Sequence, residues 1–330
     1  MLKRGSKALV RRTMPLAISA LALGAVFSFA DLDAFRGLAS RAQWNRLPAL
    51  VLLVLAIVLA VGWRWRTLLL KALTLKRSII VTALGLGGNQ ILPLRGGDAL
   101  RVVLSTRGPR APSLHAGVSA LAMEKVFDLI AVAAFGLAST AAVLVPASES
   151  QLNVVPIALA ILTIATAALL TARSGLMIKT FRYIARATHL PARPYRHLLR
   201  PLHHLRESVT PGRIAVLLIE TSVIWLLLYV LAYLAIAQLV GMTLGVAEAM
   251  VLLFAAALGL AIPAAPSGIG TFHAAIVSAF VLLGKPASEG LVLAVAIHGV
   301  FFIGFCATGG IALAIASKNA KPLRFYGEGV

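Results

Sequence analysis

Apolar runs separated by short polar or basic segments make up almost the whole chain. Nine such runs lie at 14–30, 47–63, 79–93, 118–145, 153–172, 214–240, 249–265, 271–284 and 290–316. Several of them reach the roughly 17–25 residues that a helix needs to cross a bilayer. This pattern predicts an all-α polytopic membrane protein with a single integral membrane domain over 1–330.

The basic residues gather in a few of the segments between the runs. They crowd the N-terminus, 64–78, 94–117, 173–213 and the C-terminal tail, whereas 241–248 carries none. An excess of Arg and Lys marks cytoplasmic loops. We therefore expect a multi-pass protein of the bacterial inner membrane, with both of its termini in the cytoplasm.

The apolar run 79–93 lies between two basic segments, so a simple crossing would place one of them outside. The run has about fifteen residues and contains Gly85, Gly87, Gly88 and Pro93. Runs this short are often re-entrant rather than spanning. The sequence thus predicts a hairpin over 79–110 that enters from the cytoplasm and returns to it.

A second interrupted region covers 249–284, where proline and glycine break the apolar pattern between 262 and 270. Its flanks are poor in basic residues, which predicts a hairpin that enters from the outside. With about six full spans, the two halves, about 10–145 and 153–316, then form an inverted repeat. In transporters of this kind the broken segments point to the binding site.

The strongest local motif runs from Asn89 to Arg101. Its proline and glycines prevent a continuous helix and free backbone groups, which are tolerated at membrane depth only beside protein or water. Arg95 and Arg101 suit a phosphate, since arginine binds phosphate in a bidentate manner. Asp98 has two interpretations: it pairs with an arginine and caps a helix that starts near Ala99, or it contacts the ligand.

Two carboxylates follow in an otherwise apolar run. Glu124 and Asp128 are four residues apart and share one helix face. Ionisable residues inside spans are costly, which makes a functional role the first hypothesis. One alternative is an ion-pair network with Arg95 or Arg101 that holds the hairpin, and the other is a role in transport or proton relay.

The second hairpin carries polar residues at its break. Glycine turns and helix N-termini have free backbone N–H groups that can bind anions. In this hairpin, hydroxyl and imidazole side chains provide further polar groups. The alternative is a glycine break that only allows close helix packing. His298, in the last run, is expected to be a packed, hydrogen-bonding residue. The predicted contributions of this hairpin to substrate binding are Ser267, Gly268, Gly270, Thr271 and His273.

The segment 173–213 alternates apolar and basic residues, which predicts an amphipathic helix at the membrane interface rather than a metal site. The chain has 31 Lys and Arg against 11 Asp and Glu, for a net charge of +20. Because these charges lie between membrane runs, nucleic-acid binding is excluded as a function class. One cysteine, Cys306, allows no internal disulfide or cysteine-based metal site, and we expect no metal or cofactor.

With these residues in view, the chain resembles the flippase-like transmembrane domain of the lysylphosphatidylglycerol synthase family. The matching features are Asn89, Leu92-Pro93, Arg95 to Asp98, Arg101, Glu124-Lys125, Asp128 and Pro266 to Gly270. The resemblance implies a membrane domain that handles lipids with anionic or modified headgroups. Longer members add an aminoacyl-transferase domain, which we do not expect in this chain. Many members carry an acidic residue where this chain has His273.

The leading hypothesis is therefore a flippase or transporter of a phospholipid, glycolipid or polyprenyl-phosphate lipid, and not an enzyme. One alternative is an intramembrane lipid-phosphate hydrolase or transferase, in which Ser267 or His273 acts with Glu124 or Asp128 as base. The other is a scaffold of an envelope-lipid complex. Expected partners are membrane lipids with anionic headgroups, a second copy of the chain, or a separate lipid-modifying enzyme. No nucleotide-binding loop is present for ATP-driven transport.

Overall fold

The computed structural model describes residues 42–108, 111–144, 210–262 and 266–318, together with a few single positions. Within these residues every regular element is a helix, which confirms the all-α prediction. The predicted spans 14–30 and 153–172 lie outside the described residues. The interfacial segment 173–213 also lies almost entirely outside them.

The first described half consists of a long helix, a pair of short helices and a second long helix. The elements are η1 (Trp44–Arg46), α3 (Leu47–Leu68), α4 (Leu75–Ile91), η2 (Pro93–Arg95), α5 (Gly96–Ser105) and α6 (Leu114–Leu144). Helix α3 continues to Leu68, beyond the predicted end of its apolar run at 63. Helices α4 and α5 form the predicted first hairpin.

The second described half repeats this order. Its elements are α10 (Pro211–Ser222), η3 (Val223–Tyr229), α11 (Val230–Leu239), α12 (Val246–Ala261), η4 (Pro266–Gly268), α13 (Thr271–Leu282) and α14 (Ala287–Lys318). The first three elements form one continuous helix with a π-helical middle, η3. Helices α12 and α13 form the second hairpin.

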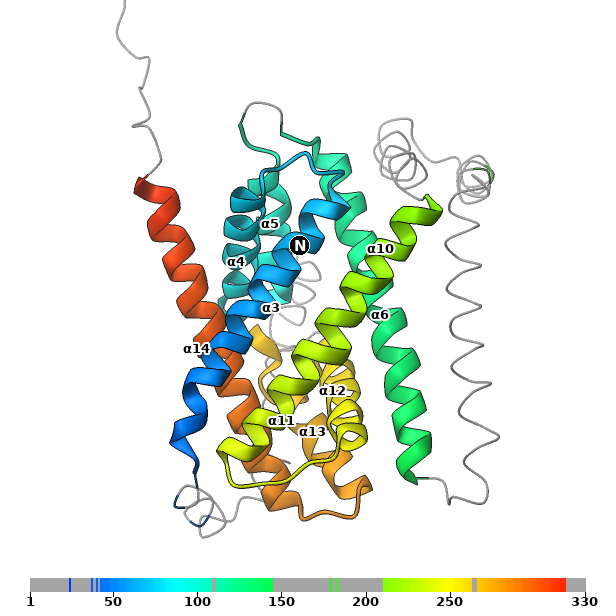
Figure 1. Cartoon of the computed structure of the whole chain (residues 1–330), viewed down its shortest axis with the longest axis vertical. Helices are drawn as coiled ribbons and strands as arrows, with labels where there is room; N and C mark the ends of the chain where they lie inside the picture. Colours follow the sequence, from blue (N-terminus) through cyan, green and yellow to red (C-terminus); the bar gives the residue numbers. More distant parts are fainter. Residues whose placement is uncertain are drawn as a thin grey trace, which may run out of the picture.

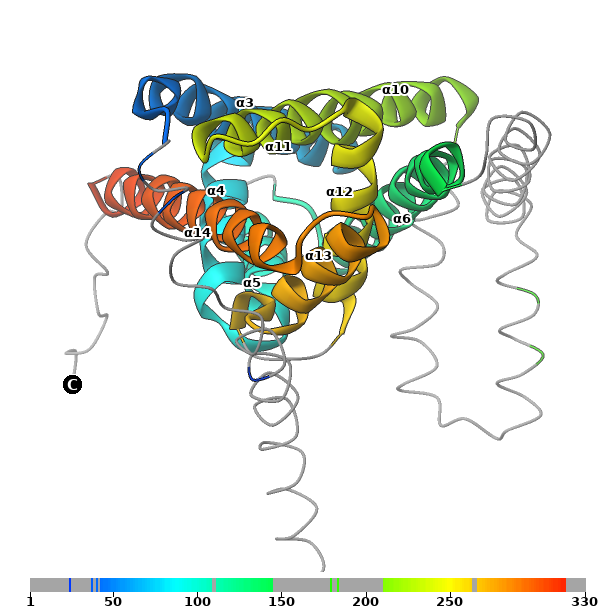
Figure 2. The same cartoon turned by 90° about the horizontal axis from the view of Figure 1, so that it is seen from below.

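The two hairpins occupy opposite ends of the molecule (Figure 1). Helices α4 and α5 lie in the upper half, α12 and α13 lie in the lower half, and α3, α10–α11 and α14 extend through both. From below, α3 and α10–α11 form one side, and α14, α13 and α5 lie opposite, with α4 and α12 between them (Figure 2). The turns η2 and η4 contact each other, so the hairpins meet tip to tip near mid-height.

The tip of the first hairpin follows from its sequence. Helix α4 ends at Ile91, just before Pro93, which has no N–H to donate and disfavours helix in the residue before it. Leu94 and Arg95 then adopt positive φ angles of 54° and 55°, which non-glycine residues rarely do. This reversal lets α5 begin at Gly96 and return to the end from which α4 came.

Glycines allow the hairpin helices to approach closely. A Cβ atom on Gly97 would overlap the Gly85 carbonyl oxygen and the Asn89 amide nitrogen. On the other side of α4, a Cβ on Gly87 would lie 2.8 Å from the carbonyl oxygen of Phe305 and 3.2 Å from the Cα of Gly309. Small residues therefore hold α4 against both α5 and α14, as is common between membrane helices.

The outer surface and the length of the helices are those of a membrane protein. Three described stretches, Trp44–Leu68, Pro211–Leu239 and Ala287–Lys318, are long and apolar enough to cross a bilayer. Helix α6 has 31 residues, or about 46 Å at 1.5 Å per residue. The chain is thus an all-α polytopic membrane protein, whereas the total of six spans remains a prediction.

Candidate functional site

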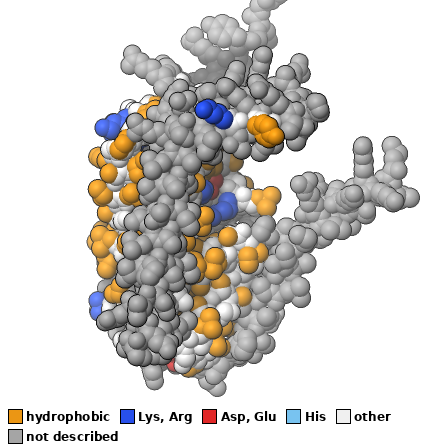
Figure 3. Space-filling view, turned by 90° about the vertical axis from the view of Figure 1, so that its right-hand side faces the viewer, with side chains coloured by type: hydrophobic (Ala, Val, Ile, Leu, Met, Phe, Trp, Pro, Cys, Tyr) orange, Lys and Arg blue, Asp and Glu red, His pale blue; other side chains and the backbone are white. Residues whose placement is uncertain are grey.

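A cavity of about 440 Å³ lies where the two hairpins meet, and α3, α6, η3, α11 and α14 complete its walls. Its size is within the range of small-ligand pockets. On the face shown in Figure 3, the molecule is hollowed, and basic and acidic side chains are visible inside the hollow among apolar ones. A charged cavity within an apolar helical bundle marks a candidate binding site.

Asn89 and Asp98 join the two helices of the first hairpin. The Asn89 side-chain Nδ2 donates to Asp98 Oδ1 at 3.0 Å, and the Asp98 backbone N–H donates to Asn89 Oδ1, also at 3.0 Å. Helix α5 begins at Gly96, so Asp98 lies in its first turn, where a carboxylate is favoured by the helix dipole. The predicted cap at Ala99 was wrong, because the tight turn before Gly96 starts the helix earlier.

Arg101 is a buried cation at the back of the cavity. Its Nη2 lies 2.6 Å from Glu124 Oε1 and 3.8 Å from Asp98 Oδ1. Its guanidinium stacks 4.1 Å above the ring of Trp65, whose Nε1 donates to Ser105 Oγ. The predicted pairing of Glu124 with an arginine of the hairpin is therefore present, and the partner is Arg101.

Asp128 pairs with a residue that the sequence analysis assigned to a cytoplasmic loop. Arg64 Nη1 lies 2.6 Å from Asp128 Oδ1, and Arg64 Nη2 lies 3.9 Å from Glu124 Oε2. Arg64 also donates to Thr221 Oγ1, and the Trp225 indole N–H donates to Asp128. Both carboxylates thus face one buried arginine on α3, as their shared helix face predicts.

Lys125 pairs with one carboxylate of the first hairpin and one of α6. Its Nζ lies 3.0 Å from Asp98 Oδ2 and 3.5 Å from Glu124 Oε1. Its side chain is 42% exposed, unlike those of Arg64 and Arg101, which are buried. Lys125 therefore pairs with the site from the accessible side of the cavity.

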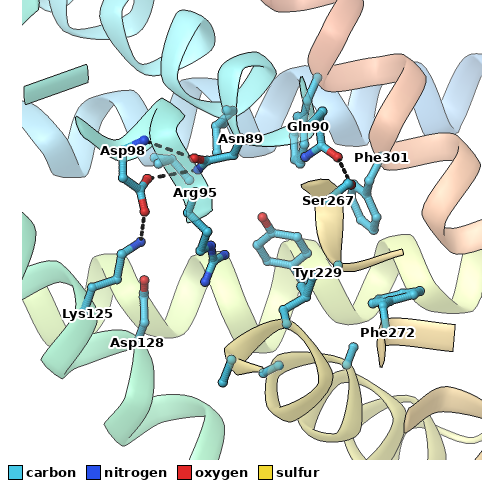
Figure 4. A pocket seen from close by; sticks show the side chains of 18 of the residues that line it. Asn89, Gln90, Arg95, Asp98, Lys125, Asp128, Tyr229, Ser267, Phe272 and Phe301 are labelled. Carbon is cyan, nitrogen blue, oxygen red and sulfur yellow. Dashed lines mark hydrogen bonds and ion pairs between the residues drawn. The ribbon is translucent and has the colours of Figure 1, made fainter. Parts of the chain in front are cut away.

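Arg95 is the exception among the cations of the cavity. It lines the cavity from the hairpin tip, and no carboxylate within the described residues forms an ion pair with it. Figure 4 shows its guanidinium pointing into the space between Asp128 and Tyr229. This leaves one arginine available to an anion, as the sequence analysis predicted.

The second hairpin contacts the first through Ser267. Its Oγ donates to Gln90 Oε1 at 2.6 Å and lies 3.2 Å from His298 Nε2 (Figure 4 shows the bond to Gln90). Ser267 has a φ of 60°, a conformation that strains a non-glycine residue. Gly268 follows it, also at the cavity wall. His298 is hydrogen-bonded, as predicted, but it also faces the cavity.

The structure does not bring the other three predicted residues of the second hairpin to the cavity wall. Gly270 and Thr271 form the start of α13, where Thr271 Oγ1 donates to the Gly268 carbonyl. The buried His273 ring stacks on His298 with centroids 4.9 Å apart, so it supports a wall residue from behind. Substrate contact by these three residues stays a prediction.

Aromatic side chains form a second wall, which adjoins the charges where Trp225 donates to Asp128. The ring centroids of Trp225 and Tyr229 are 5.0 Å apart, and those of Tyr229 and Phe301 are 5.5 Å apart. Phe301 continues the series to Phe305 at 5.5 Å. Trp225 and Tyr229 lie in the π-helical segment η3, a distortion that is frequent at functional sites.

Several lining residues were missed by the sequence analysis, namely Arg64, Gln90, Lys125, Trp225 and Tyr229. A signal for Arg64 exists: it lies at helical spacing from the buried Val61 and Leu68, on the core face of α3. The aromatic residues carried no such signal, because their position at the cavity depends on how η3 packs against α14.

The described residues define a polytopic helical membrane protein with a charged cavity between two opposed hairpins. The chain belongs to the family described as lysylphosphatidylglycerol synthase TM region, whose model matches residues 13–309. This confirms the family predicted from the motifs. Neither a curated protein nor a solved structure matches the chain.

Proposed function

We propose that this protein is a flippase or transporter for a lipid with an anionic, phosphate-containing headgroup. The observation that carries the proposal is Arg95, an arginine without an ion-pair partner among the described residues that points into the cavity (Figure 4). Every other cation of the cavity is already paired with a carboxylate. A phosphate is the partner that arginine binds best in such a position.

The surroundings of the cavity support a lipid rather than a soluble anion. Large apolar side chains at the two hairpin tips are exposed: Leu94 by 75%, Ile91 by 66% and Ile262 by 46%. Acyl or prenyl chains can lie against these residues in the bilayer, and only the headgroup then needs to enter the cavity. Burying the polar headgroup among paired charges avoids the cost of exposing it to hydrocarbon.

The arrangement of helices supports transport. The first hairpin extends from the end where the basic segments lie, and the second extends from the other end. We interpret these pairs as re-entrant hairpins of an inverted repeat, with the basic end in the cytoplasm. In this interpretation, the site at the meeting point of the tips lies between the two leaflets, which suits movement between them.

An intramembrane lipid-phosphate hydrolase or transferase is the second candidate, and the 3.2 Å distance between Ser267 Oγ and His298 Nε2 favours it. The bases predicted for that chemistry, Glu124 and Asp128, are instead held in ion pairs with Arg101 and Arg64. Ser267 also donates its hydroxyl hydrogen to Gln90. These contacts make transport the better-supported function.

Lipid movement in vesicles tests the proposal. The purified protein is reconstituted with tail-labelled phosphatidic acid and phosphatidylcholine, and the outer leaflet is reduced chemically to follow exchange. We expect rapid exchange for the wild type, and a loss of about tenfold or more in Arg95→Ala, since a hydrogen bond to a charged group contributes roughly 1.5–3 kcal/mol. Arg46→Ala, an exposed arginine outside the cavity, is the matched control.

Two outcomes would contradict transport. The first is lipid that stays in its leaflet while chromatography shows its phosphate cleaved or exchanged, which would favour the hydrolase or transferase. The second is a wild type that exchanges no lipid faster than empty vesicles. Equal rates for wild type and Arg95→Ala would instead remove Arg95 from the headgroup site.

A further inference from the structure

The cavity has two chemically different walls, which meet where the Trp225 indole donates to Asp128. Charged side chains occupy the wall formed by α3, η2, α5 and α6, whereas aromatic side chains occupy the wall formed by η3, α11 and α14. Gln90 and Ser267 lie at the border between the walls (Figure 4). A bare phosphate would contact only the first wall, so the second wall is available for another part of the ligand.

Two cations lie at the accessible side of the cavity, since Arg95 is exposed and Lys125 is 42% exposed. Deeper in the cavity, Arg101 is 2% exposed on the charged wall, and Tyr233 and Phe305 are 3% and 5% exposed on the aromatic wall. A lipid that keeps its tails outside therefore presents its phosphate to the cations first, and the rest of its headgroup points toward the rings.

The charges of the cavity restrict what that headgroup can be. Four cations, Arg64, Arg95, Arg101 and Lys125, face three carboxylates, so the described lining has one excess positive charge. A phosphodiester carries one negative charge and balances it. A phosphate monoester carries more negative charge than the one excess positive charge of the lining can balance. A phosphodiester that also bears an ammonium group is neutral overall, so the excess positive charge of the lining would stay unbalanced, which is costly inside a membrane protein.

The polar groups beside the rings are neutral. The Gln90 side-chain Oε1 accepts from Ser267, whereas its Nε2 donates to no other group within the described residues. The hydroxyl group of Tyr229 lies between Arg95 and Ser267 in Figure 4. Neutral donors and acceptors beside flat rings match a group that presents hydroxyls on its edge and C–H bonds on its face.

We propose that the aromatic wall, with Gln90 and Ser267, is a subsite for a neutral, polyhydroxylated headgroup attached to the lipid through a single phosphodiester. This inference rests on the proposed function and narrows its substrate class. The rings of Trp225 and Tyr229 provide the stacking surface. Gln90, Ser267 and the Tyr229 hydroxyl provide the hydrogen bonds, and Arg95 contacts the phosphodiester.

Three tail-labelled lipids in the same vesicles test this subsite. Phosphatidylinositol has a phosphodiester and a neutral hydroxylated ring, phosphatidic acid has a phosphate monoester alone, and phosphatidylcholine has a phosphodiester and a quaternary ammonium. We expect phosphatidylinositol to exchange fastest. The double variant Gln90→Leu/Tyr229→Phe should slow phosphatidylinositol by about tenfold, the effect of roughly two neutral hydrogen bonds, and change phosphatidic acid little. Ser139→Ala, which removes a hydroxyl bonded to Met250 away from the cavity, is the matched control.

Binding is measured separately, so that a failure of transport and a failure of the subsite are distinguishable. Short-chain phosphatidylinositol and phosphatidic acid are titrated into the detergent-solubilised protein, and the change in tryptophan fluorescence that Trp225→Phe removes is followed. Tighter binding of phosphatidylinositol without exchange would support the subsite and contradict the flippase function. Equal binding of both lipids, equal effects of the double variant on both, or a preference for phosphatidylcholine would overturn the subsite.

Discussion

Arg64 holds together the two carboxylates of α6. It is buried, lies 2.6 Å from Asp128 and 3.9 Å from Glu124, and also donates to Thr221. Charges in such a position stabilise a protein only while all partners are present, because each is costly to bury alone. The network therefore holds the charged side chains in place, and substitution of any one of its members is expected to destabilise the protein.

We expect Arg64→Leu to lower the free energy of unfolding by about 3–5 kcal/mol, since it leaves the half-buried Asp128 without its closest cation and removes a buried charge from beside Glu124. Denaturation of the detergent-solubilised protein measures this loss. Lys285→Ala is the control, because the Lys285–Glu248 pair is more exposed, at 28% and 24%, and is worth about 0–1 kcal/mol. Equal losses in the two variants would contradict the structural role of the buried network.

The sequence predicted most of the charged residues that line the site, but it did not predict all of the pairs that they form. The motif around Asn89, Arg95, Asp98 and Arg101 and the pair Glu124 and Asp128 all line the cavity. The partner of Asp128 was not predicted, because charge counting placed Arg64 in a cytoplasmic loop. Pairing across helices far apart in the chain depends on packing, which local pattern does not specify.

At the scale of elements, the first hairpin depends on the absence of side chains between α4 and α5. A Cβ on Gly97 would overlap backbone atoms of both Gly85 and Asn89, which cannot move aside as a flexible side chain could. The same contact places the Asn89–Asp98 hydrogen bonds at the cavity. Helix packing and site geometry are therefore linked at one glycine.

We expect Gly97→Ala to separate α4 from α5 and to lower the yield and the unfolding temperature of the purified protein. Gly310→Ala is the matched control, because Gly310 is also a helical glycine, and a Cβ there meets nothing within 4 Å. Alanine in an exposed helix position is favoured over glycine by roughly 0.8–1 kcal/mol, so this control should be neutral or slightly stabilised. A Gly97→Ala protein as stable as the wild type would contradict the close packing.

The hairpins and their meeting were predictable from the sequence, whereas the residues by which they contact each other were not. Short apolar runs, the proline at 93 and the glycines at 96 and 97 indicated where α4 and α5 turn. The meeting of Gln90 with Ser267 joins residues far apart in the sequence. No local pattern reports such a contact, so the aromatic wall and the bridge between the tips could be seen only in the fold.

At the scale of the whole molecule, the described helices form two halves that run in opposite directions (Figure 1). The inverted repeat that the charge distribution predicted stays a prediction. The connection between α3 and α4 (69–74) and the residues that follow α5 (106–108) lie at the end from which α4 and α5 extend. The loop between α11 and α12 lies at the other end, and it has no basic residue from 241 to 248.

We expect the basic end to face the cytoplasm. In a Cys306→Ala background, Arg107→Cys should react with an impermeant thiol reagent only from the cytoplasmic side, in inverted membrane vesicles. Thr243→Cys, in the exposed loop between α11 and α12, should react only from the outside, in intact spheroplasts. Labelling of both positions from one side would contradict the opposed hairpins.

The central claim is that lipid headgroups move through the cavity between the two hairpin tips. Gln90 and Ser267 join these tips at 2.6 Å, so a covalent link there should hold the hairpins together. The decisive measurement is lipid exchange by Gln90→Cys/Ser267→Cys in a Cys306→Ala background, joined by a short reducible thiol crosslinker. We predict that exchange stops when the link forms and returns when it is reduced in the same vesicles. Exchange that continues at an unchanged rate while the tips are linked would contradict this path.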